Sequence, residues 1–217
     1  MLRPSNRGYL EGFDTPRLGR DPPPPTHPLA TNPPTNMVER LEFDMTLYPA
    51  PVLRKPAEPV TAFDEELAEI VRAMFERMEK SNGVGLAAPQ VGLKKRILIL
   101  NHSGDPRDNL VLINPELISR SGPQIYFDEG CLSFPGIYVE VRRPERVRVK
   151  ALDASGKPFE AEYDGLISRI IQHEYDHLEG ILLVDRMTPA DKHKNRAALD
   201  NLVERHRRAS EKAESTQ

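Results

Sequence analysis

Residues 172–180 read Gln-His-Glu-Tyr-Asp-His-Leu-Glu-Gly, a stretch that contains the pattern His173-Glu174-x-x-His177. In an α-helix, residues four apart lie on the same face, so the imidazoles of His173 and His177 can converge on one metal ion. Glu174 can then reach a metal-bound water as a general base. An amphipathic helix with two ordinary histidines is the plain alternative. The pattern predicts a helix that carries two metal ligands and one catalytic carboxylate.

A catalytic metal site usually has three protein ligands and one open position. On the predicted helix, Asp176 and Glu179 point away from the face of His177. The single cysteine of the chain, Cys131, lies upstream in Glu-Gly-Cys-Leu-Ser at residues 129–133. A lone cysteine is more often an inert buried side chain, and it can also be a nucleophile. As a thiolate it is a strong ligand for zinc or ferrous iron, which makes Cys131 a candidate third ligand.

A third stretch, Gly-Val-Gly-Leu-Ala-Ala-Pro-Gln, occupies residues 83–90. Alone it would indicate a flexible turn after a helix, and no Lys-Ser/Thr follows that would make it a phosphate-binding loop. Together with residues 129–133 and 172–180, in this order, it matches the three signature motifs of peptide deformylases. The chain resembles that family from about residue 46 to residue 187.

The resemblance implies a metal-dependent hydrolase that removes the formyl group from nascent peptides beginning with N-formyl-methionine. Glu174 would take a proton from water and pass it to the departing methionine nitrogen. The side-chain amide of Gln90 and the backbone N–H of Leu132 would stabilise the developing oxyanion. The metal ligands that the resemblance implies are Cys131, His173 and His177.

The resemblance also indicates how the substrate is held. Gly83 and Gly85 would let the extended peptide lie against the loop backbone in the manner of an added strand. An apolar methionine pocket is expected to be lined by Phe127, Leu166 and Ile170, with Val84 at its mouth. The expected substrate-binding residues are Val84, Gly85, Phe127, Glu129, Leu166 and Ile170.

The identity of the metal does not follow from ligand spacing, which cannot separate zinc from ferrous iron, while affinity trends alone favour zinc. The resembled family is best known for Fe(II) enzymes in which Ni(II), Co(II) or Zn(II) substitutes with differing activity. We therefore expect one Fe(II) ion per chain. Oxygen is expected to inactivate such a site by oxidising the iron and Cys131.

Composition indicates a soluble intracellular enzyme. A chain of 217 residues can hold one domain with a proper core, and its formal net charge of −3 is unlike that of many nucleic-acid-binding proteins, so no DNA partner is expected. One cysteine allows no internal disulfide, and no apolar run is long enough for a membrane span. These features predict a bacterial-type cytoplasmic location.

The chain divides into a tail at residues 1–44, a catalytic domain at 45–188 and a C-terminal segment at 189–217. The tail holds nine of the 21 prolines and few large apolar residues, which indicates an extended or disordered segment. Its arginines leave an organellar transit peptide open as a minor alternative, although acidic residues and prolines speak against it. A mis-chosen start codon is a third interpretation, because Met37 or Met45 would begin a chain of ordinary family length.

Periodicity predicts an α+β fold with strands in meanders and helices gathered to one side. A helix with one apolar stripe is expected after Thr61, capped by Thr61 with Asp64, with Phe63 in the stripe and Asn82-Gly83 at its end. A buried helix should begin at Gly165, after a hairpin turn at residues 153–156. Strands are predicted at 96–101, 109–113, 125–127, 139–141, 147–152 and 158–163.

The C-terminal segment from Pro189 onward is predicted to be helical, polar and locally basic. One interpretation is a solvated helix that docks through Leu199, Leu202 and Val203. The other is a transient contact with ribosomal RNA, since bacterial relatives place a basic C-terminal helix there. The stretch of positive charge is short, which favours the solvated helix.

Two other classes of protein were weighed against a deformylase. A metallopeptidase that cuts internal peptide bonds shares the His-Glu-x-x-His pattern, but an upstream cysteine ligand and the motif at residues 83–90 speak against it. A non-enzymatic protein stabilised by a metal would need neither Glu174 nor an open ligand position. The sequence therefore favours the hydrolase.

Overall fold

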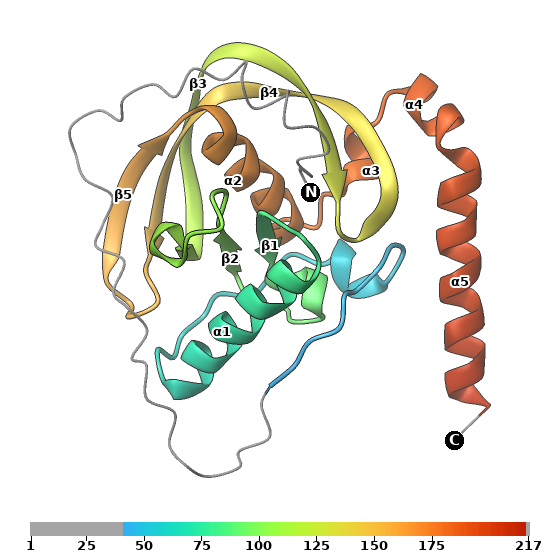
Figure 1. The fold of residues 1–217 in the computed structure, drawn as a ribbon, viewed down its shortest axis with the longest axis horizontal. Helices are drawn as coiled ribbons and strands as arrows, with labels where there is room; N and C mark the ends of the chain where they lie inside the picture. Colours follow the sequence, from blue (N-terminus) through green and yellow to red (C-terminus); the bar gives the residue numbers. More distant parts are fainter. Residues whose placement is uncertain (1–40, 216–217) are drawn as a thin grey trace.

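The computed structural model describes residues 41–215 of the chain (Figure 1). Five antiparallel strands form one sheet with the order β1-β2-β3-β4-β5, so each strand pairs with its neighbour in sequence. This confirms the predicted α+β class. The elements are α1 (Glu65–Lys80), β1 (Gly85–Ala87), β2 (Ile97–Leu100), β3 (Leu110–Cys131), β4 (Phe134–Leu152), β5 (Pro158–Tyr163), α2 (Gly165–Leu178), α3 (Leu183–Arg186), α4 (Pro189–Lys194) and α5 (Arg196–Glu214).

Strand β2 is buried on both faces and separates two parts of the core. Its residues alternate between them, because successive side chains of a strand point to opposite faces. Ile97 and Ile99 pack in the cluster that contains the apolar side of α1, and Leu98 and Leu100 pack in the cluster that contains α2. The sheet therefore holds one helix on each side at this end of the molecule.

Helix α1 has the predicted apolar stripe but a different start. Asp64 is the N-cap, and its side chain accepts a hydrogen bond of 3.0 Å from the Leu67 N–H. The predicted Thr61 cap is therefore wrong, and Phe63, which lies before the helix, is 36% exposed instead of buried. At the other end Asn82 adopts the left-handed conformation, with φ of 53°, that the sequence suggested for the Asn-Gly pair.

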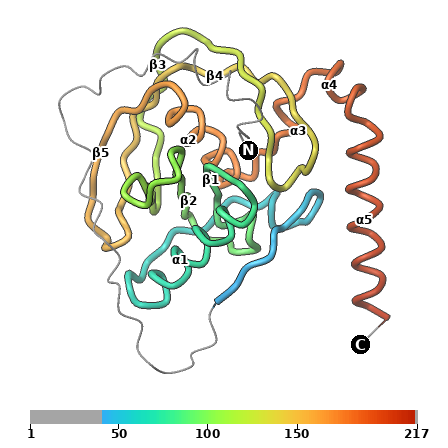
Figure 2. Tube along the Cα trace, viewed as in Figure 1, coloured from blue at the N-terminus to red at the C-terminus, as the bar shows by residue number. Residues whose placement is uncertain are grey.

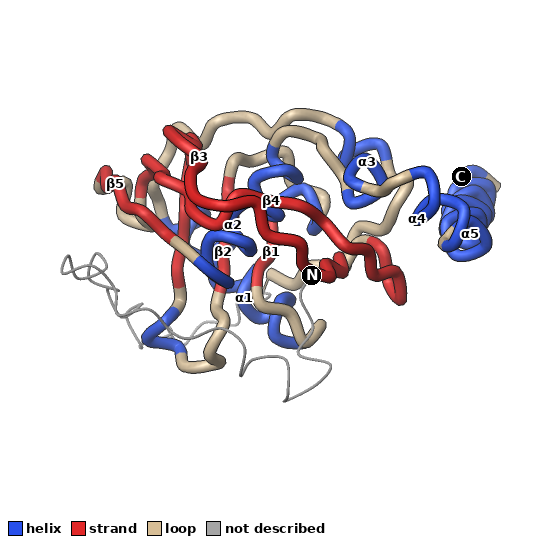
Figure 3. Tube along the Cα trace, turned by 90° about the horizontal axis from the view of Figure 1, so that it is seen from above, coloured by secondary structure: helices blue, strands red, loops and turns tan. Residues whose placement is uncertain are grey.

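Strands β3 and β4 are much longer than the sequence predicted. Residues 114–124, predicted as a connection, continue β3 through three register shifts, after Ile113, Leu117 and Ser121. Such bulges bend a strand and increase its twist, so the long pair curls over α2 (Figures 1 and 3). Strand β1 was also missed, because three buried residues give no usable alternation. The hairpin turn at 153–156 is present between β4 and β5.

Helix α2 begins at Gly165, as predicted, and lies inside the curl of the sheet (Figure 1). It contacts β1, β2 and β4. From Ser168 to Leu178 all of its residues except Tyr175 are buried. Most of these buried side chains are polar, and enclosure by the surrounding strands gives them fixed positions.

The C-terminal part consists of α3, α4 and α5, with α5 standing to one side of the body (Figures 2 and 3). Leu202 is buried and Leu199 is partly buried, and both pack against the cluster at the end of β3 and β4. Val203 is 43% exposed, so its predicted role in docking is wrong. The helix is held by a narrow contact, and most of its surface faces solvent.

The predicted tail extends into residues that pack on the domain. Leu41 and Phe43 are partly buried against the α1 cluster, and Lys80 lies 3.4 Å from Glu42. Two residues on the tail side of the boundary predicted at residue 44 therefore pack against the domain. Residues 1–40, where the tail and transit-peptide interpretations apply, lie outside the described residues. No helix within residues 41–215 combines the length and apolar character needed to cross a bilayer.

Candidate metal centre and active site

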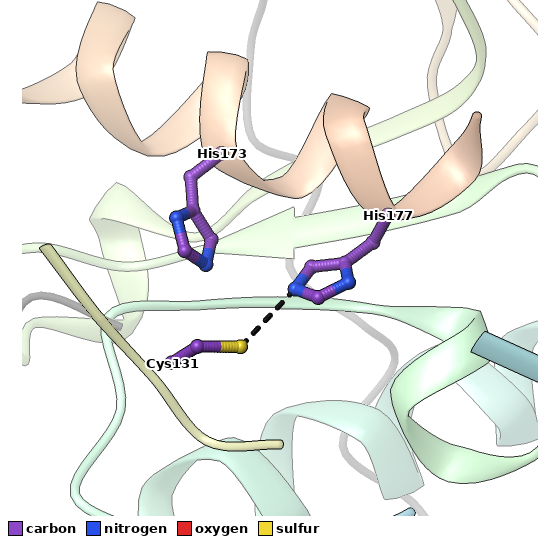
Figure 4. A group of neighbouring side chains, drawn as sticks. All are labelled: Cys131, His173 and His177. Carbon is purple, nitrogen blue, oxygen red and sulfur yellow. Dashed lines mark hydrogen bonds between the residues drawn. The ribbon is translucent and has the colours of Figure 1, made fainter. Parts of the chain in front are cut away.

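The fold brings together the three residues predicted as metal ligands (Figure 4). Cys131 ends β3, at the two-residue turn into β4, and His173 and His177 project from consecutive turns of α2. One ligand atom from each lies within 4.8 Å of the other two. The Cys131 Sγ is 3.3 Å from the His177 Nε2, and all three side chains are buried.

The chemical state of these residues fits a divalent cation. Burial lowers the pKa of His173, and burial with the neighbouring His173 lowers the pKa of His177 well below its ordinary value, so both rings are neutral as ligands must be. Burial raises the pKa of the Cys131 thiol, and a cation beside it favours the thiolate. The Nε2 of His173 is buried without a hydrogen-bond partner among the described residues, which leaves a lone pair for a metal.

Glu174 lies beside the ligands without being one of the three. It is 1% exposed, and its Oε2 has no hydrogen-bond partner within residues 41–215. Burial raises the pKa of Glu174 to about 8. A carboxyl group with so high a pKa can hold a proton near neutral pH and release it again, as a general acid and base must.

Glu129 has a different place from the one predicted for it. It is completely buried and accepts hydrogen bonds from the guanidinium of Arg143, at 2.7 and 2.9 Å, and from Arg169, at 3.0 Å. Its Oε2 lies 2.9 Å from the Nδ1 of His173. Burial acts to raise the pKa of Glu129, but the hydrogen bonds from Arg143 and His173 outweigh it and hold the pKa well below its usual range.

This arrangement makes Glu129 an orienting partner of a candidate ligand, not a free contact for substrate. A carboxylate on Nδ1 fixes the His173 ring with its Nε2 toward Cys131. Sequence reasoning missed Arg143 and Arg169 altogether. A signal for Glu129 was present, because residues two apart in a strand share a face and Glu129 is two residues before Cys131.

Gln90, predicted as an oxyanion donor, is 1% exposed and points at the site. Its Oε1 accepts a hydrogen bond of 2.8 Å from the Ala87 N–H, which fixes the orientation of the amide. Its Nε2 is consequently the free end and lies 3.6 Å from the Cys131 Sγ. Leu132 follows Cys131 directly in the turn between β3 and β4. Its backbone N–H, the second predicted oxyanion donor, is therefore next to a candidate metal ligand in the chain.

The residues predicted to form the methionine pocket lie in one apolar cluster. Ile170 is buried, and Val84, Phe127 and Leu166 are partly buried against the same cluster. Gly85 also lies close to α2. A Cβ at that position would lie 2.5 Å from the Ile170 Cγ2 and 2.8 Å from the Glu174 Oε1. The glycine therefore provides room for α2 and its carboxylate.

Comparison with known proteins agrees with this geometry. The family model described as polypeptide deformylase matches residues 43–193. The chain belongs to the peptide deformylase family. The enzymes of this family are metal-dependent hydrolases that remove N-formyl groups from nascent peptides. The buried Cys131, His173 and His177 form a cluster that can hold the required metal.

The sequence identity to individual relatives is moderate. The peptide deformylase of Acidobacterium capsulatum is 50% identical over 143 residues, which are 65% of this chain and 84% of the relative. The chloroplastic/mitochondrial peptide deformylase 1B of Arabidopsis thaliana is 49% identical over 143 residues, about half (52%) of that protein. The solved peptide deformylase of Plasmodium falciparum superposes with a TM-score of 0.74 at 41% identity, covering 76% of this chain and 97% of that one.

Proposed function

We propose that this chain deformylates N-formyl-methionyl peptides and that Glu174 carries the protons of the reaction. Its carboxylate accepts a proton from the attacking water as the oxygen joins the formyl carbon, and it delivers that proton to the methionine nitrogen as the carbon–nitrogen bond breaks. The products are formate and a free amino group. The observation that carries this proposal is the buried Glu174, with one unpaired oxygen, beside the Cys131, His173 and His177 cluster.

Cys131, His173 and His177 would hold the metal, with Glu129 behind His173. When bound, a divalent ion supplies Lewis-acid chemistry, which lowers the pKa of water and polarises a carbonyl. We propose Fe(II) as the natural ion, with Zn(II), Ni(II) and Co(II) as substitutes. A thiolate with two imidazoles suits all four ions. Metal analysis of protein purified without oxygen tests this, and zinc as the dominant metal in active preparations would contradict it.

The developing oxyanion would be stabilised by the Nε2 of Gln90 and the N–H of Leu132. The Gln90 amide is already oriented by its bond to Ala87, so it loses little freedom when the substrate arrives. Strand β1 is an edge of the sheet, with β2 on one side only. At such an edge an extended peptide can add as a further strand.

The direct test of the proposal is hydrolysis of formyl-Met-Ala by protein purified anaerobically. Released formate and free amine should appear in equal amounts, and acetyl-Met-Ala serves as the matched control because it differs by one methyl group. An internally cleaved peptide without formate would instead indicate a metallopeptidase. Absence of both products from metal-loaded protein would overturn the proposal.

We propose that Val84, Phe127, Leu166 and Ile170 form the methionine pocket. An apolar pocket of fixed size should favour methionine, or its straight-chain analogue, by roughly 1–3 kcal/mol for each methylene-sized mismatch. Comparison of kcat/KM for formyl-Met-Ala and formyl-Gly-Ala measures this preference. Equal values for the two peptides would remove the pocket from the proposal.

The basic residues of α5 are the surface that we propose for a ribosome contact. Several are already paired within the helix, since Arg207 and Arg208 contact Glu204 at 2.8 and 2.7 Å. Binding through the remaining charge should be weak and sensitive to salt. Co-sedimentation with ribosomes at low and physiological salt tests it, and a chain ending at residue 194 is the control.

We propose a bacterial-type cytoplasmic location, because a reducing compartment keeps the Cys131 thiol available as a ligand. Fusion of residues 1–44 to a reporter tests the organellar alternative. Uptake with cleavage near Met37 or Met45 would reverse the assignment.

A further inference from the structure

A polar cavity lies away from the Cys131, His173 and His177 cluster and is lined by residues of β3, β4, α2 and α3. Its volume is about 180 Å³. The polar residues that line it are Arg120, Arg142, Arg143, Gln172, Asp176 and Arg186. Four arginines and one aspartate are an unusual lining, because cations placed together without matching anions repel one another.

The ion pairs around the cavity do not balance these charges. Arg143 contacts both Glu129 and Asp176, and each of these carboxylates is shared with a second arginine. Arg169 takes the other place on Glu129, at 3.0 Å, and Arg186 the other place on Asp176. Two buried carboxylates therefore form ion pairs with three arginines, which leaves one positive charge in excess.

Arg120 and Arg142 add two further positive charges. Neither forms an ion pair with a residue in the range 41–215, and Arg142 has only a contact with the ring of Tyr126, 6.0 Å from its centroid. On the same two strands Arg146 and Arg148 do have acidic partners, Glu145 at 3.6 Å and Glu160 at 2.5 Å. Among the arginines of β3 and β4, the two without an acidic partner in the described chain therefore both line the cavity.

We propose that this cavity binds a phosphoryl group, as free inorganic phosphate or as the end of a small phosphorylated molecule. A phosphoryl group carries up to two negative charges and several acceptor oxygens, which planar guanidinium groups bind in pairs. The volume admits such a group with a few waters but leaves little room for a larger ligand. Arg143 would hold it from the buried side, and Arg120, Arg142 and Arg186 from the rim.

The test is calorimetric titration of the metal-loaded protein with inorganic phosphate at constant ionic strength in a chloride buffer. The double variant Arg120→Gln/Arg142→Gln should weaken phosphate binding roughly tenfold or more, because charged hydrogen bonds are lost. The matched control is Arg146→Gln/Arg148→Gln, which removes the same charge from β4 outside the cavity. It should change the affinity less than about twofold.

Three results would overturn the proposal: no binding by the unchanged protein, equal losses in both double variants, or unchanged affinity in Arg120→Gln/Arg142→Gln. Unchanged affinity in Arg120→Gln/Arg142→Gln would mean that phosphate binds to the metal or to another surface. Glycerol phosphate distinguishes the sources, since binding of both ligands indicates a phosphorylated molecule and binding of inorganic phosphate alone indicates the free ion. Binding of single-stranded RNA through the same arginines, without binding of phosphate, would make this surface a nucleic-acid contact instead. None of these outcomes depends on deformylase activity.

Discussion

Glu174 combines deep burial with an oxygen that has no hydrogen-bond partner in the described part of the chain. Such a group is costly, because a buried polar atom without a partner loses the hydration that it has in the unfolded chain. The neighbours that could have satisfied it are apolar or absent. Gly85 has no side chain, and Ile170 packs against the same space. The site is thus arranged so that the carboxylate is left for a reacting water.

Replacing Glu174 by glutamine should preserve metal content and reduce kcat by about 10²–10⁴-fold or more, because glutamine has the same shape but cannot carry a proton. Elemental analysis and turnover of formyl-Met-Ala measure the two quantities. Cys131→Ala is the contrasting variant and should lose metal as well as activity. Near-normal turnover of Glu174→Gln would end the proposed mechanism.

A single added methyl group at position 85 should have a large effect. In Gly85→Ala the new Cβ meets Ile170 and Glu174 at distances that real contacts do not reach, so α2 or its carboxylate must shift. We expect a loss of about 1–3 kcal/mol in stability and a fall in kcat of about 10–100-fold. Urea denaturation and steady-state kinetics measure these effects. A normal kcat with retained metal would show that the position of Glu174 tolerates the shift.

How far the site could be predicted differs from residue to residue. His173 and His177 were predictable because helical spacing is local, and Cys131 because the chain offers no other cysteine. The role of Glu129 was not predictable, because it depends on β3, β4 and α2 meeting at one point. Its partners Arg143 and Arg169 are 14 and 40 residues away from it in the sequence. Contacts between elements that are far apart in the chain produce no periodic pattern in the sequence.

Among the elements, β3, β4 and α2 are joined by one buried network. Arg143, on β4, reaches Glu129 on β3 and Asp176 on α2, and it also lies 3.4 Å from the Gln172 carbonyl oxygen. Burial opposes its charge, but the hydrogen bonds that it donates to Glu129 and the charges of both carboxylates raise the pKa of Arg143 above its ordinary value. The helix that carries the histidines is therefore fixed to the sheet by charge as well as by packing.

Arg143→Met should destabilise the metal-loaded protein by about 3–5 kcal/mol, because two buried carboxylates lose their shared partner while methionine fills similar space. The urea midpoint measures the loss. Arg146→Met, at an exposed position on the same strand, is the control and should stay within about 0.5 kcal/mol of the original protein. Equal midpoints for the two variants would show that the buried network adds nothing.

The strands show where local pattern fails as a guide. The strands predicted at 96–101, 109–113 and 158–163 coincide with β2, the start of β3 and β5, because alternation or a continuous apolar run marks them. Residues 114–124 contain two prolines and a glycine and are mostly exposed, so nothing local marks them as strand. They are strand because β4 runs beside them and the bulges absorb the irregular residues.

At the scale of the whole molecule, the domain begins earlier than its sequence suggested. Leu41 and Phe43 cover part of the α1 cluster, and the Thr46 N–H donates a hydrogen bond of 2.7 Å to the Gln90 carbonyl oxygen. The N-terminal strip therefore supports the segment that holds the predicted oxyanion donor. Composition alone could not reveal this, because two apolar residues in a polar stretch are common in tails.

A chain that begins at residue 41 should keep the melting temperature and turnover of the full protein. A chain that begins at Met45 should lose about 1–3 kcal/mol of stability, because it gives up the partly buried Leu41 and Phe43. Thermal unfolding of the two truncated proteins, measured side by side, tests the difference. Identical melting temperatures would show that residues 41–44 add no stability and would support a domain boundary at residue 44.

The sheet is a simple meander in which every strand pairs with its predecessor, and α2 comes after all five strands in the chain. During synthesis the strands emerge first, and their concave face has no cover until residues 165–178 leave the ribosome. Until then Cys131 has neither of its partner ligands, since both histidines lie on α2. The protein gains its metal-binding capacity in one step, late in its own translation.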